Sequence, residues 1–324
     1  MNISVILCTY NRCRSLEQTL TSLSASALPD RIGWEVLVVD NNSCDQTRSV
    51  AEAFRSGFPG RLRYLFEPRP GKSYALNTGI REARGEVLAF LDDDLTVETT
   101  WLHNLTANLH HGDWVGAGGK TLLAQSFAPP GWMALKGPYS LGGVLAASFD
   151  LGDIPQQLTQ APYGANMAFH RKMFEKYGLF RTDLGPSPDR DTPRPNEDTE
   201  FGRRLLAAGE RLRYEPTAIA YHPVPEGRVQ KRYFLAWHFD WGRALVREWH
   251  RGPDVLGIPR PYFNMVSVAA RKMVPDALRW LFALNPQRKF YARCHIYVAA
   301  GEMAEFYHLL LRERRGSVQP GFTA

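Results

Sequence analysis

Three consecutive acidic residues, Asp92, Asp93 and Asp94, follow the strand-like run 86–91 without a break. Adjacent carboxylates raise one another's pKa unless a positive charge neutralises them. Hard cations such as Mg²⁺ and Mn²⁺ prefer carboxylate oxygens and substrate phosphates, so these acids suit a divalent metal. A solvated acidic turn that caps a helix near residues 96–99 is the alternative. We favour the metal site because the acids directly follow a strand with the pattern of a buried one.

Two other acidic positions stand at the ends of predicted elements. Asp40 ends the β-branched run 35–39, whereas Glu197 and Asp198 begin an amphipathic helical pattern. Acidic residues in the first helical turn interact favourably with the helix dipole, which gives this pair a structural explanation. That explanation is compatible with a chemical role for the same carboxylates.

These acids belong to an alternation of strands and helices in the first 120 residues. The predicted strands cover residues 3–8, 35–40, 62–66 and 86–91, and the predicted helices cover 15–23, 45–56 and 73–85, with Ser73 as a helix cap. This alternation indicates crossover connections and a mostly parallel sheet flanked by helices. Ligands of such sheets bind beyond the carboxyl ends of the strands, where Thr9–Arg12, Asp40–Ser43 and Asp92–Asp94 stand. The sequence therefore predicts an α/β domain of the nucleotide-binding type.

The rest of the chain is organised differently. Residues 125–162 are rich in Pro, Gly and Gln, which predicts a long irregular segment that serves as a lid or binding loop. Further strands are predicted at 164–169 and 211–221, and the pattern beyond residue 227 is helical. We therefore expect an α/β domain over residues 1–224 and a mainly helical, basic extension over residues 225–324.

Six segments together resemble the family 2 glycosyltransferases of the GT-A fold. They are ISVILCTYNR (3–12), EVLVVDNNS (35–43), GKSYALNTGI (71–80), GEVLAFLDDD (85–94), YGANMAFHRKMFEKYGLF (163–180) and NEDTEFGRRLLAAG (196–209). Their order and spacing match the family over about residues 3–223, and no comparable match covers the C-terminal hundred residues. The resemblance implies a Rossmann-like catalytic domain, with a nucleotide-sugar-binding half over about 1–120 and an acceptor-binding half over about 121–224.

The resemblance also implies an inverting transferase with a nucleotide-diphosphate sugar, expected to be UDP-linked, as donor. The residues implied to bind the donor are Thr9, Tyr10, Asn11, Arg12, Asp40, Lys72, Asn77, Asp92, Asp93, Gly164 and Asn166. The last two lie on a strand whose small residues let the donor sugar approach the backbone.

Within this set, the loop Thr9–Arg12 is implied to hold the nucleotide, although its tyrosine fits a packed loop residue equally well. Asp40 is implied to pair with the base or the ribose, and Lys72 and Asn77 to approach the base and the diphosphate. Many relatives carry Arg just before that asparagine, whereas this chain has Leu76. We therefore expect Lys72 to supply the positive charge.

The resemblance extends to a metal site. Asp92 and Asp94 match the D-x-D acids of the family, with Asp94 as a direct ligand and Asp92 acting on the metal or ribose through water, while Asp93 is expected to contact the sugar. His222 matches a position where related enzymes supply a further ligand, but a structural histidine at a strand end is an equal alternative. The expected cofactor is Mg²⁺ or Mn²⁺, which lets the diphosphate leave as a stabilised anion.

The acceptor side follows from the same resemblance. Asp198 is implied to be the general base that takes the proton of the acceptor hydroxyl, with Glu197 binding the acceptor or orienting the site. The expected acceptor is a glycan or a lipid-linked saccharide in cell-surface polysaccharide synthesis. A metal-dependent nucleotidyltransferase is the alternative enzyme, but a Gly-rich phosphate loop near the first strand is absent. A catalytically silent relative is disfavoured by the intact acids Asp92, Asp94 and Asp198.

The distribution of charge along the sequence limits the classes of partner that we expect. The 324 residues carry a net charge of +6, and residues 225–324 hold 16 Lys and Arg against 8 Asp and Glu, so the whole excess lies there. Basic and aromatic residues alternate between 228 and 251, which is typical of an amphipathic helix on an anionic membrane. A helical extension packed on the catalytic domain with a solvated basic face explains the pattern as well.

Two further partner classes follow from the sequence. A nucleic-acid-binding protein that uses the basic third is an alternative of another class, but no nucleic-acid module is recognisable and residues 1–224 are net negative, so no nucleic-acid partner is expected. Four scattered cysteines and the lack of a signal peptide or membrane-length apolar run predict a cytoplasmic protein, soluble or attached to the inner face of the membrane.

Overall fold

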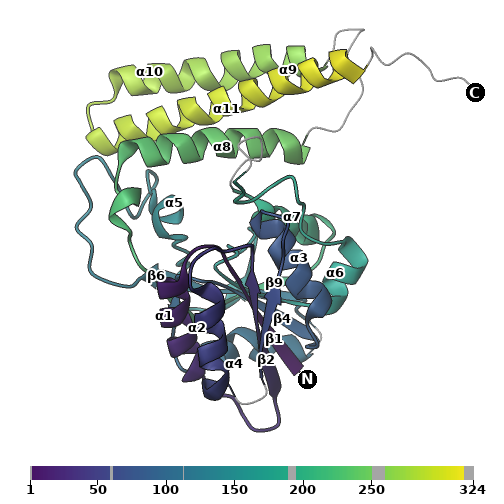
Figure 1. Cartoon of the computed structure of the whole chain (residues 1–324). Helices are drawn as coiled ribbons and strands as arrows, with labels where there is room; N and C mark the ends of the chain where they lie inside the picture. The colour runs from purple at the N-terminus through teal and green to yellow at the C-terminus, as the bar shows by residue number, and fades with distance from the viewer. Residues whose placement is uncertain (1, 59–60, 112, 189–194, 250–259, 317–324) are drawn as a thin grey trace, which may run out of the picture. The chain divides into compact units, whose positions relative to one another are not determined.

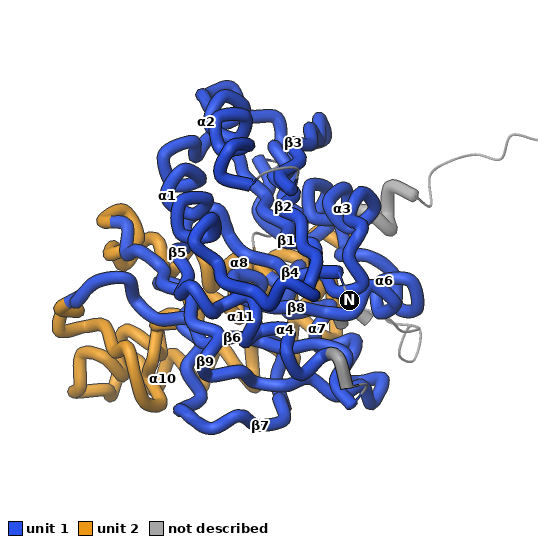
Figure 2. Tube along the Cα trace, turned by 90° about the horizontal axis from the view of Figure 1, so that it is seen from below, with its two compact units in different colours: residues 1–127, 145–192, 196–225 blue, residues 128–144, 193–195, 226–324 orange. Residues whose placement is uncertain are grey.

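The computed structural model describes residues 2–58, 61–111, 113–188, 195–249 and 260–316. The chain divides into two compact units, shown in different colours in Figure 2. Unit 1 comprises residues 1–127, 145–192 and 196–225, and unit 2 comprises residues 128–144, 193–195 and 226–324. Residues 128–144, which the sequence analysis assigned to the catalytic domain, thus belong to the helical unit.

Unit 1 is built on one sheet. Among the described residues its strands are β1 (Asn2–Thr9), β2 (Gly33–Asp40), β3 (Leu62–Phe66), β4 (Val87–Asp92), β5 (Thr96–Val97), β6 (Gly116–Leu123), β7 (Gln156–Gln157), β8 (Asn166–His170) and β9 (Leu212–His222). The order is β3-β2-β1-β4-β8-β6-β9-β5, with β7 paired to β9. The predicted α/β class is confirmed, but the sheet is parallel only from β3 to β4 and between β6 and β9. β8 enters antiparallel to both β4 and β6, which makes the whole sheet mixed.

Helices cover both faces of this sheet. Those of unit 1 are α1 (Cys13–Ser24), α2 (Thr47–Ala53), α3 (Lys72–Glu82), α4 (Trp101–Thr106), α6 (Arg171–Tyr177) and α7 (Glu197–Ala207), and α5 spans Gly142–Ala146 (Figure 1). Apolar residues of α1, α2 and α4 pack on one face, and those of α3, α6 and α7 pack on the other. The sheet is therefore the middle layer of unit 1, as expected for strands joined by crossover helices.

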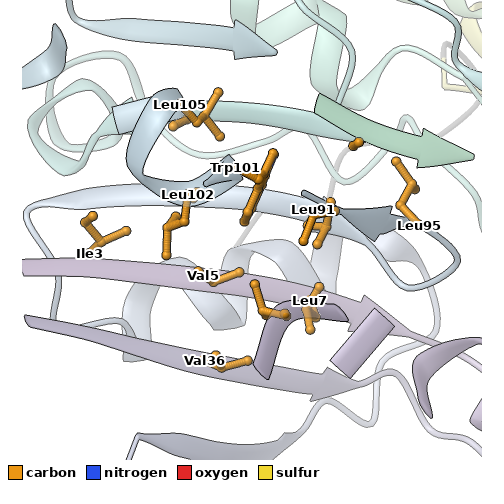
Figure 3. Packing of buried hydrophobic residues seen from close by; sticks show 14 of the residues in the cluster. Ile3, Val5, Leu7, Val36, Leu91, Leu95, Trp101, Leu102 and Leu105 are labelled. Carbon is orange, nitrogen blue, oxygen red and sulfur yellow. The ribbon is translucent and has the colours of Figure 1, made fainter. Parts of the chain in front are cut away.

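The alternation of side chains along β1 shows why two cores form. Ile3, Val5 and Leu7 point to the face of α1 and α4, where Figure 3 shows them beside Trp101 and Leu102. Ile6 points to the opposite face and joins the cluster of α3 and α7. Because successive strand residues alternate between faces, a strand that is apolar on both sides must be covered on both sides.

The C-terminal part of unit 2 is mainly helical among its described residues, whereas residues 128–141 form turns and irregular segments. Its helices are α8 (Lys231–Trp249), α9 (Arg260–Val268), α10 (Val274–Phe282) and α11 (Pro286–Gly316), and the π-helical segment Ala269–Met273 joins α9 to α10. α11 packs against α8 and also against α9 and α10 (Figure 1). A C-terminal helical region is thus confirmed.

Phe201 lies in the apolar cluster on the face of the sheet covered by α3, α6 and α7, and we predict that its truncation strongly destabilises the protein. This ring is fully buried and stacks on Phe174 with centroids 4.3 Å apart. Phe201→Ala should lower the free energy of unfolding by about 3–5 kcal/mol, measured by urea denaturation, because the cavity cannot close completely. The control Phe66→Ala, at a side chain 52% exposed, should change it by no more than about 0.5 kcal/mol. Equal losses in the two variants would contradict this packing.

Candidate active site

The acidic strand ends predicted from sequence do meet at one edge of the sheet. β1 lies between β2 and β4, and all three are parallel, so their carboxyl ends point the same way. Thr9 is in register with Asp40, and Cys8 with Asp92. The residues that follow these strands therefore start from neighbouring positions, as expected for the ligand-binding edge of a parallel sheet.

Arg12 neutralises part of the acidic run. Its Nη1 lies 3.0 Å from Asp93 Oδ1 and 3.0 Å from Asp94 Oδ2, while nearly half of the Arg12 side chain stays exposed. Burial raises the pKa of Asp93 to about 6 despite Arg12, and the neighbouring Asp94 adds to the rise. The structure thus assigns Arg12 to the acids, a contact that the sequence analysis did not foresee.

Lys72 joins the acidic run to the second acidic pair. It is the first residue of α3, and its Nζ lies 2.8 Å from Asp92 Oδ1 and 3.3 Å from Glu197 Oε1. Burial lowers the pKa of Lys72, but Asp92, Glu197 and Asp198 outweigh it and hold that pKa well above its usual range. Burial also raises the pKa of Asp92, and the attraction of Lys72 reverses this, so the Asp92 carboxyl stays ionised. The lysine therefore remains charged between the two carboxylates.

Glu197 and Asp198 begin α7 as predicted, and the side chain of each packs closely against a glycine. The Asp198 carboxylate accepts hydrogen bonds from the backbone N–H groups of Gly164 and Thr199. A Cβ on Gly164 would lie 2.7 Å from Asp198 Oδ2, and one on Gly185 would lie 3.0 Å from Glu197 Cδ. Gly164 was predicted to let the donor sugar approach the backbone. In the structure its lack of a side chain lets the Asp198 carboxylate approach the backbone.

Burial sets the ionisation of Glu197. The side chain is almost fully buried, and this raises its pKa to about 7; Lys72 opposes the rise and Asp198 adds to it. The residue is therefore poised to change charge near neutral pH, unlike an ordinary surface glutamate.

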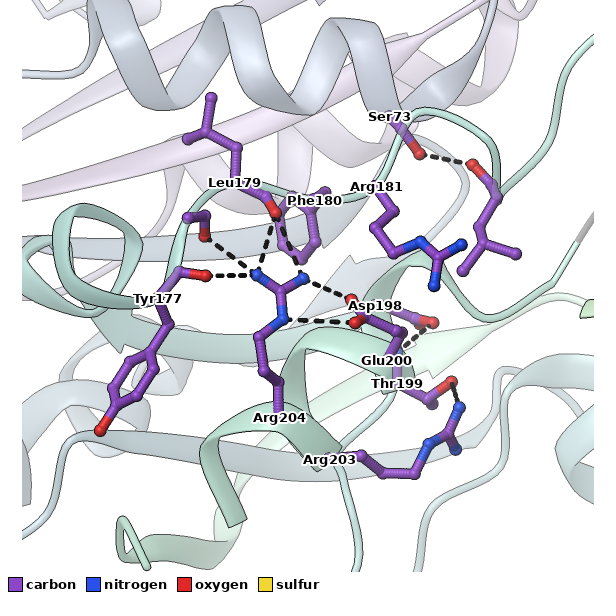
Figure 4. Close-up of polar contacts among 12 residues, drawn as sticks. Ser73, Tyr177, Leu179, Phe180, Arg181, Asp198, Thr199, Glu200, Arg203 and Arg204 are labelled. Atoms are coloured by element: carbon purple, nitrogen blue, oxygen red, sulfur yellow. Dashed lines mark hydrogen bonds and ion pairs between the residues drawn. The ribbon is translucent and has the colours of Figure 1, made fainter. Parts of the chain in front are cut away.

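Arginines hold the first turns of α7 in place (Figure 4). Arg204 donates to the backbone carbonyls of Tyr177 and Leu179 and pairs with Glu200. Arg203 Nη2 lies 3.4 Å from Thr199 Oγ1. These contacts tie α7 to the segment after α6, so the acids at its start have a rigid support.

Asp94 and His222 form a donor pair suited to a divalent metal. His222 Nδ1 lies 2.6 Å from the carbonyl oxygen of Pro223, which only accepts hydrogen bonds, so Nδ1 carries a hydrogen. An imidazole that donates through Nδ1 can ligate a metal through Nε2, and Nε2 of His222 lies 3.7 Å from Asp94 Oδ1. Among the described residues no group of three or more His, Cys, Asp or Glu side chains could hold a metal ion. Two protein ligands fit a metal whose other positions belong to phosphate and water.

Three predicted donor-binding residues are engaged with the protein itself. Both oxygens of Asp40 accept hydrogen bonds, from Ser43 N–H at 2.9 Å and from the Tyr64 hydroxyl at 2.7 Å. The Asn77 amide exchanges two hydrogen bonds with the backbone of Phe180. The Asn166 amide contacts the indole N–H of Trp101 and the carbonyls of Lys120 and Ala218. These contacts give each residue a structural role, and donor contacts by them stay predictions.

The first loop is half open. Tyr10 is 48% exposed, so it is not the packed loop tyrosine of the alternative interpretation. Asn11 adopts a φ of 52° and accepts a hydrogen bond from Cys44 N–H at 2.8 Å, which ties the loop after β1 to the loop after β2. Thr9 is buried, and its carbonyl accepts the N–H of Asn41.

Asn41 is a site residue that the sequence analysis missed. Its amide donates to the carbonyl of Arg69 at 2.7 Å and accepts the N–H of Gly71 at 2.7 Å. Gly71 has a φ of 131°, which favours glycine, and it directly precedes Lys72. Asn41 therefore fixes the loop 69–71, which positions Lys72. Its place in the turn after Asp40 was the available signal.

Comparison with known proteins agrees with this geometry. The profile of the family described as "Glycosyl transferase family 2" matches residues 4–178. The chain is 30% identical over 238 residues to the succinoglycan biosynthesis protein ExoM of Rhizobium meliloti, which covers 73% of this chain and 70% of that protein.

The chain belongs to glycosyl transferase family 2.

Solved structures show the same fold. The mannosyltransferase PcManGT from Pyrobaculum calidifontis, in complex with GDP-Man and Mn²⁺, superposes with a TM-score of 0.61 at 21% identity, covering 93% of this chain and 86% of that chain. Residues 1–349 of TarS from S. aureus, in complex with UDP, superpose with a TM-score of 0.50 at 18% identity, covering 98% and 92%. The predicted GT-A fold is confirmed, and a glycosyltransferase takes precedence over the nucleotidyltransferase alternative. Within the described residues, no helix has the length and apolarity needed to span a bilayer.

The raised pKa of Glu197 makes stability depend on pH in this family member. Between the ordinary pKa of a glutamate, 4.5, and the folded value of about 7, the unfolded chain ionises first, so stability falls as pH rises. Urea denaturation should show that Glu197→Gln reduces the fall in unfolding free energy from about pH 5 to about pH 7 by about 2 kcal/mol. An unchanged slope would contradict the buried state of Glu197.

Proposed function

We propose that this enzyme transfers a sugar, with inversion, from a nucleotide-diphosphate donor to a hydroxyl group of a glycan or lipid-linked saccharide in cell-surface polysaccharide synthesis. The observation that carries the proposal is the Lys72 bridge from Asp92 at the end of β4 to Glu197 at the start of α7. The two acids lie on either side of one cation, which supports the proposal that one serves the donor and the other the acceptor.

The donor half of the proposal rests on the edge formed by β1, β2 and β4. Tyr10 is exposed there, and Arg12 and Lys72 provide positive charge among the acids. The neighbours named above were solved with GDP-Man and with UDP. We propose UDP as the nucleotide of the donor. GDP is the alternative, and the calorimetric titration described below compares the two.

The metal half of the proposal rests on Asp94 and His222. Their oxygen and imidazole nitrogen fit Mg²⁺ or Mn²⁺, and Mn²⁺ is present in the PcManGT complex. A bound divalent metal would stabilise the negative charge that develops on the departing diphosphate. Arg12 holds Asp94 in position from the other side, through the carboxylate oxygen that does not face His222.

Asp198 is the proposed general base. Its carboxylate is held by two backbone N–H groups at the N-terminus of α7, and a carboxylate fixed in this way can accept a proton from the attacking hydroxyl. Glu197 is tied to Lys72 and almost fully buried, so a role in orienting the site suits it better than proton transfer with an acceptor. The name of ExoM, with its reference to succinoglycan biosynthesis, supports a saccharide acceptor.

Removal of the base should separate chemistry from binding. Asp198→Asn should lower the turnover of sugar transfer by roughly 10²–10⁴-fold, the usual range for a lost general base. The Kd of the donor, measured by calorimetry, should change no more than a few-fold because Asp198 contacts neither metal nor diphosphate in this scheme. Glu175→Gln, at an exposed acid of α6, is the control. Near-normal turnover in Asp198→Asn would place the base elsewhere.

Removal of the metal should weaken donor binding. Asp94→Asn, or EDTA added to the native enzyme, should raise the Kd of UDP about tenfold or more, because a metal-mediated contact to the diphosphate is lost. Asp113→Asn, at an exposed acid outside this cluster, is the control. The same titration with GDP shows whether the enzyme prefers a uracil or a guanine nucleotide. Unchanged UDP affinity in both metal-depleted cases would overturn the metal assignment.

A further inference from the structure

Large exposed apolar side chains gather on one helix of unit 2. The described ones on or just after α9 and α10 are Tyr262, Phe263, Val266, Val274, Leu278, Trp280, Leu281, Phe282 and Leu284. Phe282 is 74% exposed and Leu284 is 98% exposed. Contiguous exposed apolar surface on a globular protein marks an interaction site rather than chance exposure.

These side chains share one face of a nearly continuous helix. Phe263, Val266, Ala270, Val274 and Leu278 recur every three or four residues along α9, the π-helical segment and α10, so they form one stripe. We call this stripe, together with Trp280, Leu281, Phe282 and Leu284, the apolar ridge.

The opposite stripe of the same helix faces its own unit. Val268, Met265 and Met273 pack with Ala299 and Phe306 of α11. The helix thus buries one side against its neighbours, and the apolar ridge is the side left without a partner within the described part of unit 2.

Basic residues border the ridge. Residues 260–289 contain six Lys and Arg and one acid, Asp276, which is buried and paired with Arg279 at 2.7 Å. Arg271 is exposed, whereas Lys272 pairs with the buried Glu302 of α11 at 2.6 Å. Lys289 is exposed, and its Nζ lies 5.7 Å from the ring centroid of Trp280. An apolar stripe bordered by cations, with a tryptophan beside them, matches the chemistry of an anionic lipid leaflet.

The helix singled out by the sequence pattern has a different role. Phe234 of α8 is fully buried against Trp132 and Phe290, and Arg243 and Arg247 pair with the buried Glu305 of α11. Phe234, Arg243 and Arg247 of α8 therefore contribute to the packing of unit 2, and lipid contact by this helix stays a prediction.

We propose that the apolar ridge docks the enzyme on the surface of an anionic phospholipid bilayer. Its side chains enter the boundary between headgroups and acyl chains, and Arg271 and Lys289 contact the phosphates. A second copy of the chain is the less suitable occupant, because a symmetric pairing would bring the same cations face to face without acids to balance them. The proposal does not depend on the sugar donor or acceptor.

Vesicle sedimentation of the full chain tests this proposal. Vesicles of phosphatidylcholine mixed with phosphatidylglycerol should bind the protein at least about tenfold more tightly than phosphatidylcholine alone, and raising the salt from about 0.1 M to about 0.5 M should weaken binding. Leu281→Glu combined with Leu284→Glu should reduce binding at least about tenfold, because both carboxylates would enter the apolar region. Ile154→Glu, at a side chain 76% exposed in unit 1, should bind like the unmodified chain.

Three results would overturn it. The first is equal binding to neutral and anionic vesicles, and the second is unchanged vesicle binding by the double variant. The third is that sedimentation velocity shows a dimer for the unmodified chain and a monomer for the double variant. Circular dichroism and the Kd of UDP should be unaltered in the double variant, which separates lipid docking from the proposed catalytic function. Leu284→Glu alone, which has almost no packing to lose, should reproduce part of the loss.

Discussion

The ammonium group of Lys72 lies between two carboxylates that reach it from distant parts of the chain, Asp92 at 2.8 Å and Glu197 at 3.3 Å. Buried charges are costly unless they are paired, so this cation and these acids must fold together. The loop before Lys72 is held by Asn41, and the Lys72 N–H donates to the carbonyl of Pro186. One charge thus fixes the positions of β4, α3 and α7 around the site.

The same cluster explains why its members differ in ionisation. Asp92 contacts Lys72 directly and stays ionised, whereas Glu197, more deeply buried, has a pKa of about 7 and Asp93 one of about 6. Near neutral pH the cluster can therefore change its charge by gaining or losing a proton. Groups with such separated pKa values are characteristic of sites where binding and proton transfer occur together.

Much of this arrangement is predictable from sequence because strand ends and helix starts carry strong local signals. The apolar runs before Asp40 and Asp92 specify buried strands, and Glu197 marks a helix start. What the sequence could not show is tertiary partnership. Ser73, predicted as a helix cap, instead donates its hydroxyl to the carbonyl of Leu184 (Figure 4). Likewise, the small size of Gly164 is required by Asp198, which is 34 residues away and invisible to any local pattern.

The account depends most on the energetic coupling between Lys72 and Glu197, which a double-mutant cycle measures in urea denaturation near neutral pH. Lys72→Met alone should lower the free energy of unfolding by about 3–5 kcal/mol, because the acids lose their buried counter-charge. In the Glu197→Gln background the same change should cost at least about 1 kcal/mol less, since one of those acids is already neutral. Additive effects of the two substitutions would contradict the bridge from which the whole site is built.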